Sequence, residues 1–338
     1  MTMGLQRVIG WWRRSADHPI QRAEFAHQMR AGLMPTPQRT RRGLSILLVM
    51  IAAASACKLM LSNTPYWASL TGASSIQTFS TLNTIQSTLI FLILSALGFQ
   101  HWRWLSAAAR GAAGAIARER GGRTWEALIL TGVDAQHIVA GKWQASLRIA
   151  LTDGRSLLSA RTVAVLWLFT PLVGLNGAFG WNAPPPITVV LAAIVALSYP
   201  LIFSVFSAAC GLLASALSGS ETTAARISGL TLVGGMIIGG AMNASALAFA
   251  GVLFRDINFT SITFLSAVTP IDGGILTILT LTLTDSMEFA RRDQAEILLI
   301  VAGAMAINLA VYAAVTWSAL RVSVWLVLRN GASRHTVV

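Results

Sequence analysis

The chain has 338 residues, of which 54% are hydrophobic and 11% are charged, and its formal net charge is +12. An average soluble domain carries about 25% charged residues, so the composition excludes an ordinary cytosolic enzyme, and the long unalternating apolar runs exclude a porin-like barrel. The sequence predicts an all-α integral membrane protein, because windows of about 20 nearly uncharged residues can cross a hydrocarbon core about 30 Å thick.

Residues 1–43 are predicted to form a cytoplasmic or interfacial leader. A helix start near Asp17-His18-Pro19 is followed by a segment in which Phe25, Met29 and Leu33 share one stripe. Such a helix either lies flat on the inner leaflet or packs against the protein itself. The sequence leaves both placements open.

A single transmembrane domain is expected over residues 44–320, followed by a cytoplasmic tail at 321–338. A basic cytoplasmic loop at 101–155 joins its second span to its third. Gly235 and Gly239 stand at a spacing that permits close approach of helices. The apolar runs predict about six transmembrane helices, at 44–62, 79–100, 157–179, 187–217, 227–254 and 296–320.

Residues 255–296 leave two topologies open. This region is apolar but is broken by Pro270-Ile271-Asp272-Gly273-Gly274, so its two pieces of about ten residues cannot span separately. A re-entrant outer hairpin at about 262–284, or a pair of interfacial outer helices, keeps six spans and an inner C-terminus. A seventh span would put Arg329 and Arg334 outside, and the charge rule therefore favours six spans.

The distribution of basic residues predicts the orientation. Eight arginines precede Gly43, and nine basic residues lie between Arg103 and Arg161. Lys and Arg near the ends of spans resist translocation, so both regions are expected to face the cytoplasm. We therefore expect a multi-pass protein of the inner (plasma) membrane with a cytoplasmic N-terminus. No nucleic-acid partner is expected, because the basic clusters flank apolar runs and do not form an aromatic-laced basic surface.

The most polar long stretch, RERGGRTWEALILTGVDAQHIVAGKW at 118–143, predicts two helices. Gly121-Gly122 gives a flexible entry, and Thr124 is expected to cap a short helix that carries Glu126 in its first turn. A Thr-Gly pair ends this helix, and Asp134 is expected to cap the next one. A short helix bracketed by glycines on a cytoplasmic loop is a rigid protrusion that can dock into a groove of another protein.

This stretch resembles the first inner loop of the permease subunits of type-2 ATP-binding-cassette (ABC) exporters. That loop often runs Glu-Arg-x-x-Gly-Thr-x-Glu-x-Leu-Leu-x-Thr, followed by a capped helix ending in Gly-Lys. His18-Pro19-Ile20 with Glu24 likewise resembles the Asn-Pro-x leader and its glutamate. Arg123 and Gly132 depart from the pattern, standing where Gly and Pro are usual, and His18 replaces the usual Asn. The matching loop positions are Glu119, Arg120, Thr124, Glu126, Leu128, Leu130, Thr131, Ile138, Gly141 and Lys142.

The resemblance implies that the short helix contacts a separate ABC ATPase subunit. It also implies a homodimer or heterodimer of permeases, embedded in membrane lipids, that exports an unidentified substrate. Pro19 and Glu24 would belong to the interfacial leader. The implied ATPase-coupling residues are Glu119, Arg120, Thr124, Trp125, Glu126, Leu128, Leu130 and Thr131.

The chain has no phosphate loop of its own. Gln136 stands where the loop needs a glycine five positions before Gly141, and Trp143 stands where Ser or Thr must follow Lys142. The Gly-Lys pair is instead expected to be the basic start of a membrane helix. ATP is thus expected in the partner subunit, and no catalytic residue, cofactor or metal is expected in this chain.

Two other classes of protein stay open. A secondary carrier needs an ionisable group near mid-membrane, and Asp272 is the best candidate, although a turn-forming Asp before two glycines is the simpler account. A non-transporting scaffold or regulatory subunit would be indifferent to ATP. A membrane enzyme is not expected, because the five histidines are scattered and form no constellation with usable spacing.

Overall fold

The computed structural model describes residues 22–24, 26, 45–46, 49–56, 69, 75–122, 124, 134–168, 186–254 and 294–332. Within these ranges the chain is helical apart from short turns, and no strand occurs. The predicted all-α class is therefore confirmed for the part of the chain that is described. Its long helices are α5 (Ser75–Gly121), α7 (Ala135–Leu168), α9 (Pro186–Leu217), α10 (Glu221–Phe254) and α13 (Gln294–Ala332).

Three of these helices contain a segment long and apolar enough to cross a membrane. The segments are Leu197–Leu217 in α9, Glu221–Ala246 in α10 and Ala302–Arg329 in α13. The shortest has 21 residues and rises about 32 Å, which exceeds the hydrocarbon thickness of about 30 Å. All three overlap the last three spans that the sequence predicts.

The segment predicted as an inner loop, 101–155, is largely helical. α5 continues through the predicted second span to Gly121, a length of 47 residues or about 70 Å, and α7 begins at Ala135. Residues 101–121 continue the helix because they carry an apolar stripe at helical spacing. In α5 this stripe is made of buried apolar residues, among them Ala109, Ala112 and Ile116.

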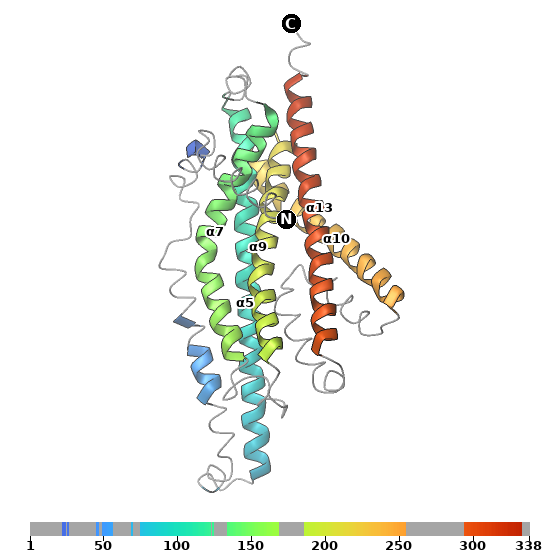
Figure 1. Ribbon diagram of the computed structural model, residues 1–338. Coiled ribbons are helices and arrows are strands. Elements are labelled where there is room, and N and C mark those ends of the chain that lie inside the picture. The colour runs from blue at the N-terminus through green and yellow to red at the C-terminus, as the bar shows by residue number, and fades with distance from the viewer. Residues whose placement is uncertain are drawn as a thin grey trace.

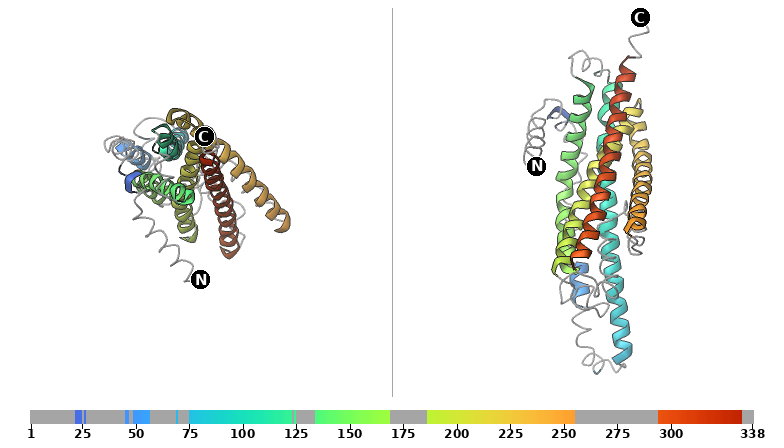
Figure 2. Two further views of the ribbon diagram at one scale, coloured as in Figure 1. Left: turned by 90° about the horizontal axis from the view of Figure 1, so that it is seen from above. Right: turned by 45° about the vertical axis from the view of Figure 1, so that its right-hand side comes forward.

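The five helices alternate in direction along the chain (Figure 1). α5, α9 and α13 run one way, and α7 and α10 run the other way. The C-terminal ends of the first three and the N-terminal ends of the other two therefore gather at one end of the bundle, which we call the polar end. At the opposite end, α5 extends beyond the other four helices (Figures 1 and 2).

α9 is the central helix, because it packs against each of the other four. Its closest neighbour is α5, where a Cβ added to Gly211 would overlap the backbone carbonyl of Ala109. α5 is joined to α7 in turn by Trp104, whose indole Nε1 donates to the carbonyl of Ala150 at 2.6 Å. Gly211 and Ala109 let the backbones of α9 and α5 approach closely, whereas an indole ring makes the contact between α5 and α7.

An aromatic cluster fills the middle of the bundle. The ring centroids of Phe203 and Phe206 on α9 lie 4.5 and 5.3 Å from that of Tyr312 on α13. On α10, a Cβ at Gly235 would come within 2.7 Å of Phe206, and one at Gly239 within 2.8 Å of Tyr312. The predicted close approach at this glycine pair is confirmed, and the groups that approach are aromatic side chains.

Candidate functional site

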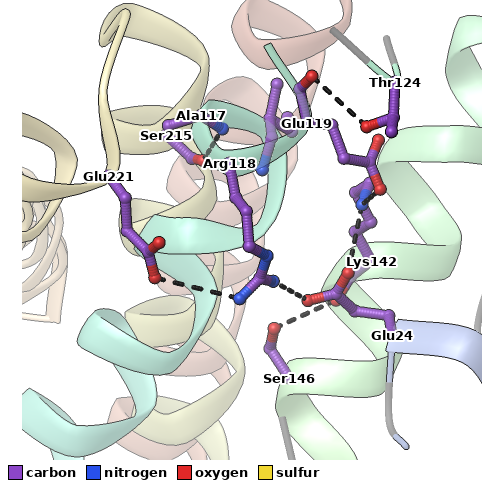
Figure 3. Close-up of polar contacts among 10 residues, drawn as sticks. Glu24, Ala117, Arg118, Glu119, Thr124, Lys142, Ser146, Ser215 and Glu221 are labelled. Atoms are coloured by element: carbon purple, nitrogen blue, oxygen red, sulfur yellow. Dashed lines mark hydrogen bonds and ion pairs between the residues drawn. The ribbon is translucent and has the colours of Figure 1, made fainter. Parts of the chain in front are cut away.

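Charged side chains from four segments meet at the polar end (Figure 3). They are Glu24 of the leader, Arg118 and Glu119 of the last turn of α5, Lys142 of α7 and Glu221, the first residue of α10. We call these five residues the ion cluster. Segments as far as 118 residues apart in sequence are joined here by direct contacts between side chains.

Lys142 lies at the centre of the ion cluster, with a side chain that is 0% exposed. Its Nζ lies 2.5 Å from Oε1 of Glu119 and 3.1 Å from Oε2 of Glu24. The other oxygen of Glu24 accepts a hydrogen bond from Nη2 of Arg118 at 2.7 Å. Nη1 of Arg118 lies 3.8 Å from Glu221, whose side chain is 55% exposed. Acidic and basic groups thus alternate from the buried centre to the solvated edge.

Burial makes these pairs obligatory. An isolated charge taken out of water costs several kcal/mol, so Lys142 can be buried as a cation only with carboxylates against it. Glu24, with a side chain 5% exposed, is held in the same way by two cations. This part of the leader therefore packs on the protein, which is one of the two placements that the sequence left open.

Capping interactions fix the helix ends that carry the ion cluster. The backbone N–H of Gln136 donates to Oδ1 of Asp134 at 3.4 Å, and the carbonyl of Asp134 accepts from Ile138 at 3.1 Å. The predicted cap at Asp134 is therefore confirmed. At the start of α10, Oγ of Ser220 accepts from the N–H of Thr223 at 3.3 Å. These caps satisfy N–H groups that a helix start leaves without an intrahelical partner.

The end of α5 is also bonded to the end of α9. Oγ of Ser215 accepts from the backbone N–H groups of Ile116 and Ala117, at 2.8 and 2.9 Å. Nη1 of Arg120 donates to the carbonyl of Ala216 at 2.9 Å. The last turn of α5 is consequently held by α9 on one side and by Lys142 of α7 on the other.

Of the ten residues to which the sequence gave a role in ATPase coupling or in the leader, four lie in the described part of the chain. Glu24 and Glu119 share one cation, Lys142, and Arg120 contacts α9. Thr124 is exposed, and its hydroxyl donates to the carbonyl of Glu119 at 3.3 Å. The other six lie outside the described residues, and their predicted roles stay predictions: Pro19, Trp125, Glu126, Leu128, Leu130 and Thr131.

The sequence did not reveal Arg118, Lys142 and Glu221 as members of one site. Lys142 was expected to be the basic start of a membrane helix, whereas its partners are 23 and 118 residues away in the chain. One local signal did exist. Lys142 occupies the stripe of α7 formed by the buried residues Ile138 and Ala145, and a lysine in an apolar stripe needs a partner.

Among the residues that the structure describes, no group of His, Cys, Asp and Glu is placed to hold a metal ion. Comparison with family models, curated proteins and solved structures finds no match for this chain. Fold and site together define the class as a helical protein, with three helices able to cross a membrane and a buried ion cluster at one end of the bundle.

Proposed function

We propose that the protein is the permease subunit of a type-2 ABC exporter of the inner membrane, which moves an unidentified substrate with energy from a separate ATPase subunit. The observation that carries the proposal is the ion pair between Glu119 and Lys142. These residues flank the segment 122–134, in which the sequence predicts the short docking helix. The two ends of that segment are therefore joined by an ion pair, and Lys142 also joins them to the leader through Glu24.

The ion cluster would let the docking segment act on several helices at once. Closure of two ATPase subunits moves their surface grooves by ångströms, and a helix seated in a groove follows that movement. The displacement reaches α5 and α7 together because Lys142 binds Glu119, and it reaches α9 through Ser215. Packed helices carry such a shift as rigid bodies, since their cores are not continuously deformable.

The positions of the helix ends support the six-span topology. α10 ends at Phe254 and α13 begins at Gln294, and both ends lie away from the polar end (Figure 1). The connection between them therefore returns to the side it left, as a re-entrant hairpin does and a single seventh span does not. The polar end carries Arg118, Lys142 and Arg329, which supports a cytoplasmic location for it.

The direct test is whether an ABC ATPase co-purifies with the protein. The tagged full chain would be purified in mild detergent, as wild type, with residues 124–131 deleted, and as Glu126→Lys. Thr222→Lys is the control, because it adds a lysine at an exposed site of the polar end, on α10. We expect mass spectrometry to find the ATPase in the samples of the wild type and of the control. In the samples of the 124–131 deletion and of Glu126→Lys, we expect at least about tenfold less of it.

Two outcomes would contradict the proposal. Normal association and transport after deletion of 124–131 would remove the docking mechanism. Absence of an ATPase from every sample, under conditions that preserve a known exporter complex, would remove the exporter function. A secondary carrier or a non-transporting scaffold, each able to act without ATP, would then become the leading hypothesis.

A further inference from the structure

The C-terminal half of α13 carries alternating Trp and Arg residues on its outer side. We call Trp317, Arg321, Trp325 and Arg329 the Trp–Arg stripe, because a spacing of four places them along one side of the helix. The guanidinium carbon of Arg321 lies 5.2 Å from the ring centroid of Trp317, and that of Arg329 lies 5.2 Å from that of Trp325. Both pairs are cation–π contacts.

The stripe faces away from the bundle. Trp317 is 61% exposed and Trp325 is 53% exposed, and both arginines are exposed as well. α13 packs on its neighbours through other positions, such as the buried residue Val327. The four residues of the stripe are therefore available to whatever surrounds the bundle.

The positive charge of the stripe has no counter-charge near it on its own helix, because the only carboxylate in the sequence of α13, Glu296, lies 25 residues before Arg321. No Asp or Glu follows Glu296 in the sequence. Within the described ranges, the ion pairs of the protein involve neither Arg321 nor Arg329. Since no carboxylate among the described residues pairs with these two guanidinium groups, an anion from the surroundings of the bundle can bind there.

The position of the stripe indicates what kind of anion this is. It lies within the candidate span Ala302–Arg329, in the half nearer the polar end (Figures 1 and 2). Arg321 lies eight residues before Arg329, about 12 Å along the helix axis, whereas the headgroup layer of one leaflet is only about 5–7 Å thick. Arg321 is thus near the hydrocarbon boundary, where an arginine is costly without an anion beside it.

We propose that the Trp–Arg stripe binds an anionic phospholipid of the leaflet at the polar end. The phosphate groups pair with the two arginines, and the indole rings occupy the interface, where Trp is enriched. Val322, which is exposed beside Arg321, lies at the boundary where the acyl chains begin. The inference is independent of the exporter function.

Protein partners fit this surface less well. A soluble subunit reaches the end of a span but not Arg321, about 12 Å further in. A symmetric contact between two copies through α13 would set the same stripe against itself. Arginines would then face arginines without a carboxylate, which is unfavourable in a low dielectric.

Native mass spectrometry of the delipidated full chain tests the proposal. The protein would be titrated with phosphatidylglycerol and, separately, with phosphatidylcholine of the same acyl chains. We expect the wild type to prefer phosphatidylglycerol, and R321Q/R329Q to bind it about 5- to 25-fold more weakly, since each basic residue near an anionic surface contributes about fivefold. Phosphatidylcholine binding should stay unchanged.

The control is R103Q/R110Q, which removes the same charge from two exposed positions of α5. We expect it to bind phosphatidylglycerol nearly as the wild type does. An equal loss in both double variants would mean general attraction to a basic protein, and no loss in R321Q/R329Q would mean that the stripe is not a lipid site. Either result overturns the proposal.

Two further variants separate the remaining explanations. W317L/W325L keeps both charges but removes the rings, and we expect it to weaken phosphatidylglycerol binding by at most about 5- to 30-fold, which is the combined contribution of two exposed cation–π contacts. R329Q alone serves if the double variant does not fold, with an expected loss of about fivefold. If R321Q/R329Q still binds lipid but loses a co-purifying protein, the stripe is a binding site for that protein. This outcome would contradict the proposal.

Discussion

At the scale of single residues, Lys142 decides how the polar end is built. Its ammonium group is buried between two carboxylates that come from different parts of the chain. Buried ion pairs add little net stability compared with a well-packed apolar core, but they specify which groups meet. The leader, α5 and α7 are therefore held in one arrangement by a single cation.

Replacing Lys142 with Met should lower the free energy of unfolding by about 3–5 kcal/mol, because it leaves Glu119 without its cation and Glu24 with Arg118 alone. Thermal unfolding in detergent would measure the change. Arg226→Met is the control, since Arg226 is exposed on α10, and it should have an effect within about 0.5 kcal/mol.

A triple variant checks the cause of that loss. When Glu24→Gln and Glu119→Gln accompany Lys142→Met, both carboxylates that lost Lys142 are replaced by neutral amides and Arg118 keeps Glu221, so we expect more than half of the lost stability to return. A triple variant less stable than Lys142→Met alone would show that packing of the lysine side chain, and not its charge, stabilises this end.

The sequence allowed part of this site to be predicted. Glu24 and Glu119 were found because each belongs to a local pattern, the leader motif and the inner-loop motif. Arg118 and Glu221 belong to no such pattern, and their contacts join residues 94 positions apart or more. Contacts of that kind depend on how helices are placed in space, which local spacing does not encode.

At the scale of helices, apolar runs predicted where helices exist but not how far they extend. α9 spans Pro186–Leu217, close to the predicted 187–217, because that helix is apolar over its whole length. α5 and α7 extend beyond the predicted spans, since a segment rich in charge can still bury one stripe against a neighbouring helix. Hydropathy therefore underestimates a helix whose outer side is polar.

Gly211→Ala should separate α5 from α9. The added Cβ would overlap the backbone of Ala109, which cannot rotate away, and we expect a loss of about 1–3 kcal/mol in the free energy of unfolding. Gly229→Ala is the matched control, because no atom lies within 4 Å of its Cβ position. It should be neutral or stabilising by up to about 1 kcal/mol, as Ala favours a helix over Gly.

The stability of the two glycine variants would be compared by thermal unfolding. Size-exclusion chromatography in detergent would show whether each variant elutes as a single species. Equal stability of Gly211→Ala and Gly229→Ala would contradict the close backbone contact between α5 and α9. A loss confined to Gly211→Ala would support it.

At the scale of the whole molecule, the alternating directions of the helices make topology testable. With the polar end in the cytoplasm, a cysteine at Ser333 should react in intact cells only with membrane-permeant reagents. A cysteine at Ser69, before the start of α5, should react with impermeant reagents. Both would be introduced after Cys57 and Cys210 are changed to Ala, so that only the new thiol is read.

Labelling of the cysteine at position 333 by an impermeant reagent would contradict the six-span topology. If neither site reacts with either reagent in intact cells, the experiment would be repeated in opened vesicles. Both sites should react there, because the reagent reaches both sides of the membrane. Protection of position 69 from the impermeant reagent in intact cells, with labelling in opened vesicles, would also count against the proposed orientation.

The central position of α9 has a consequence for synthesis. α5 and α7 leave the ribosome before α9 does, so the stripe of small residues around Ala109 has no partner on α9 until that helix is made. Gly211 and Ser215, which contact α5, arrive about 100 residues after their partners. A chain truncated before residue 186 would therefore lack the helix that contacts all the other long helices, and the surface of α5 that packs on α9 would stay uncovered.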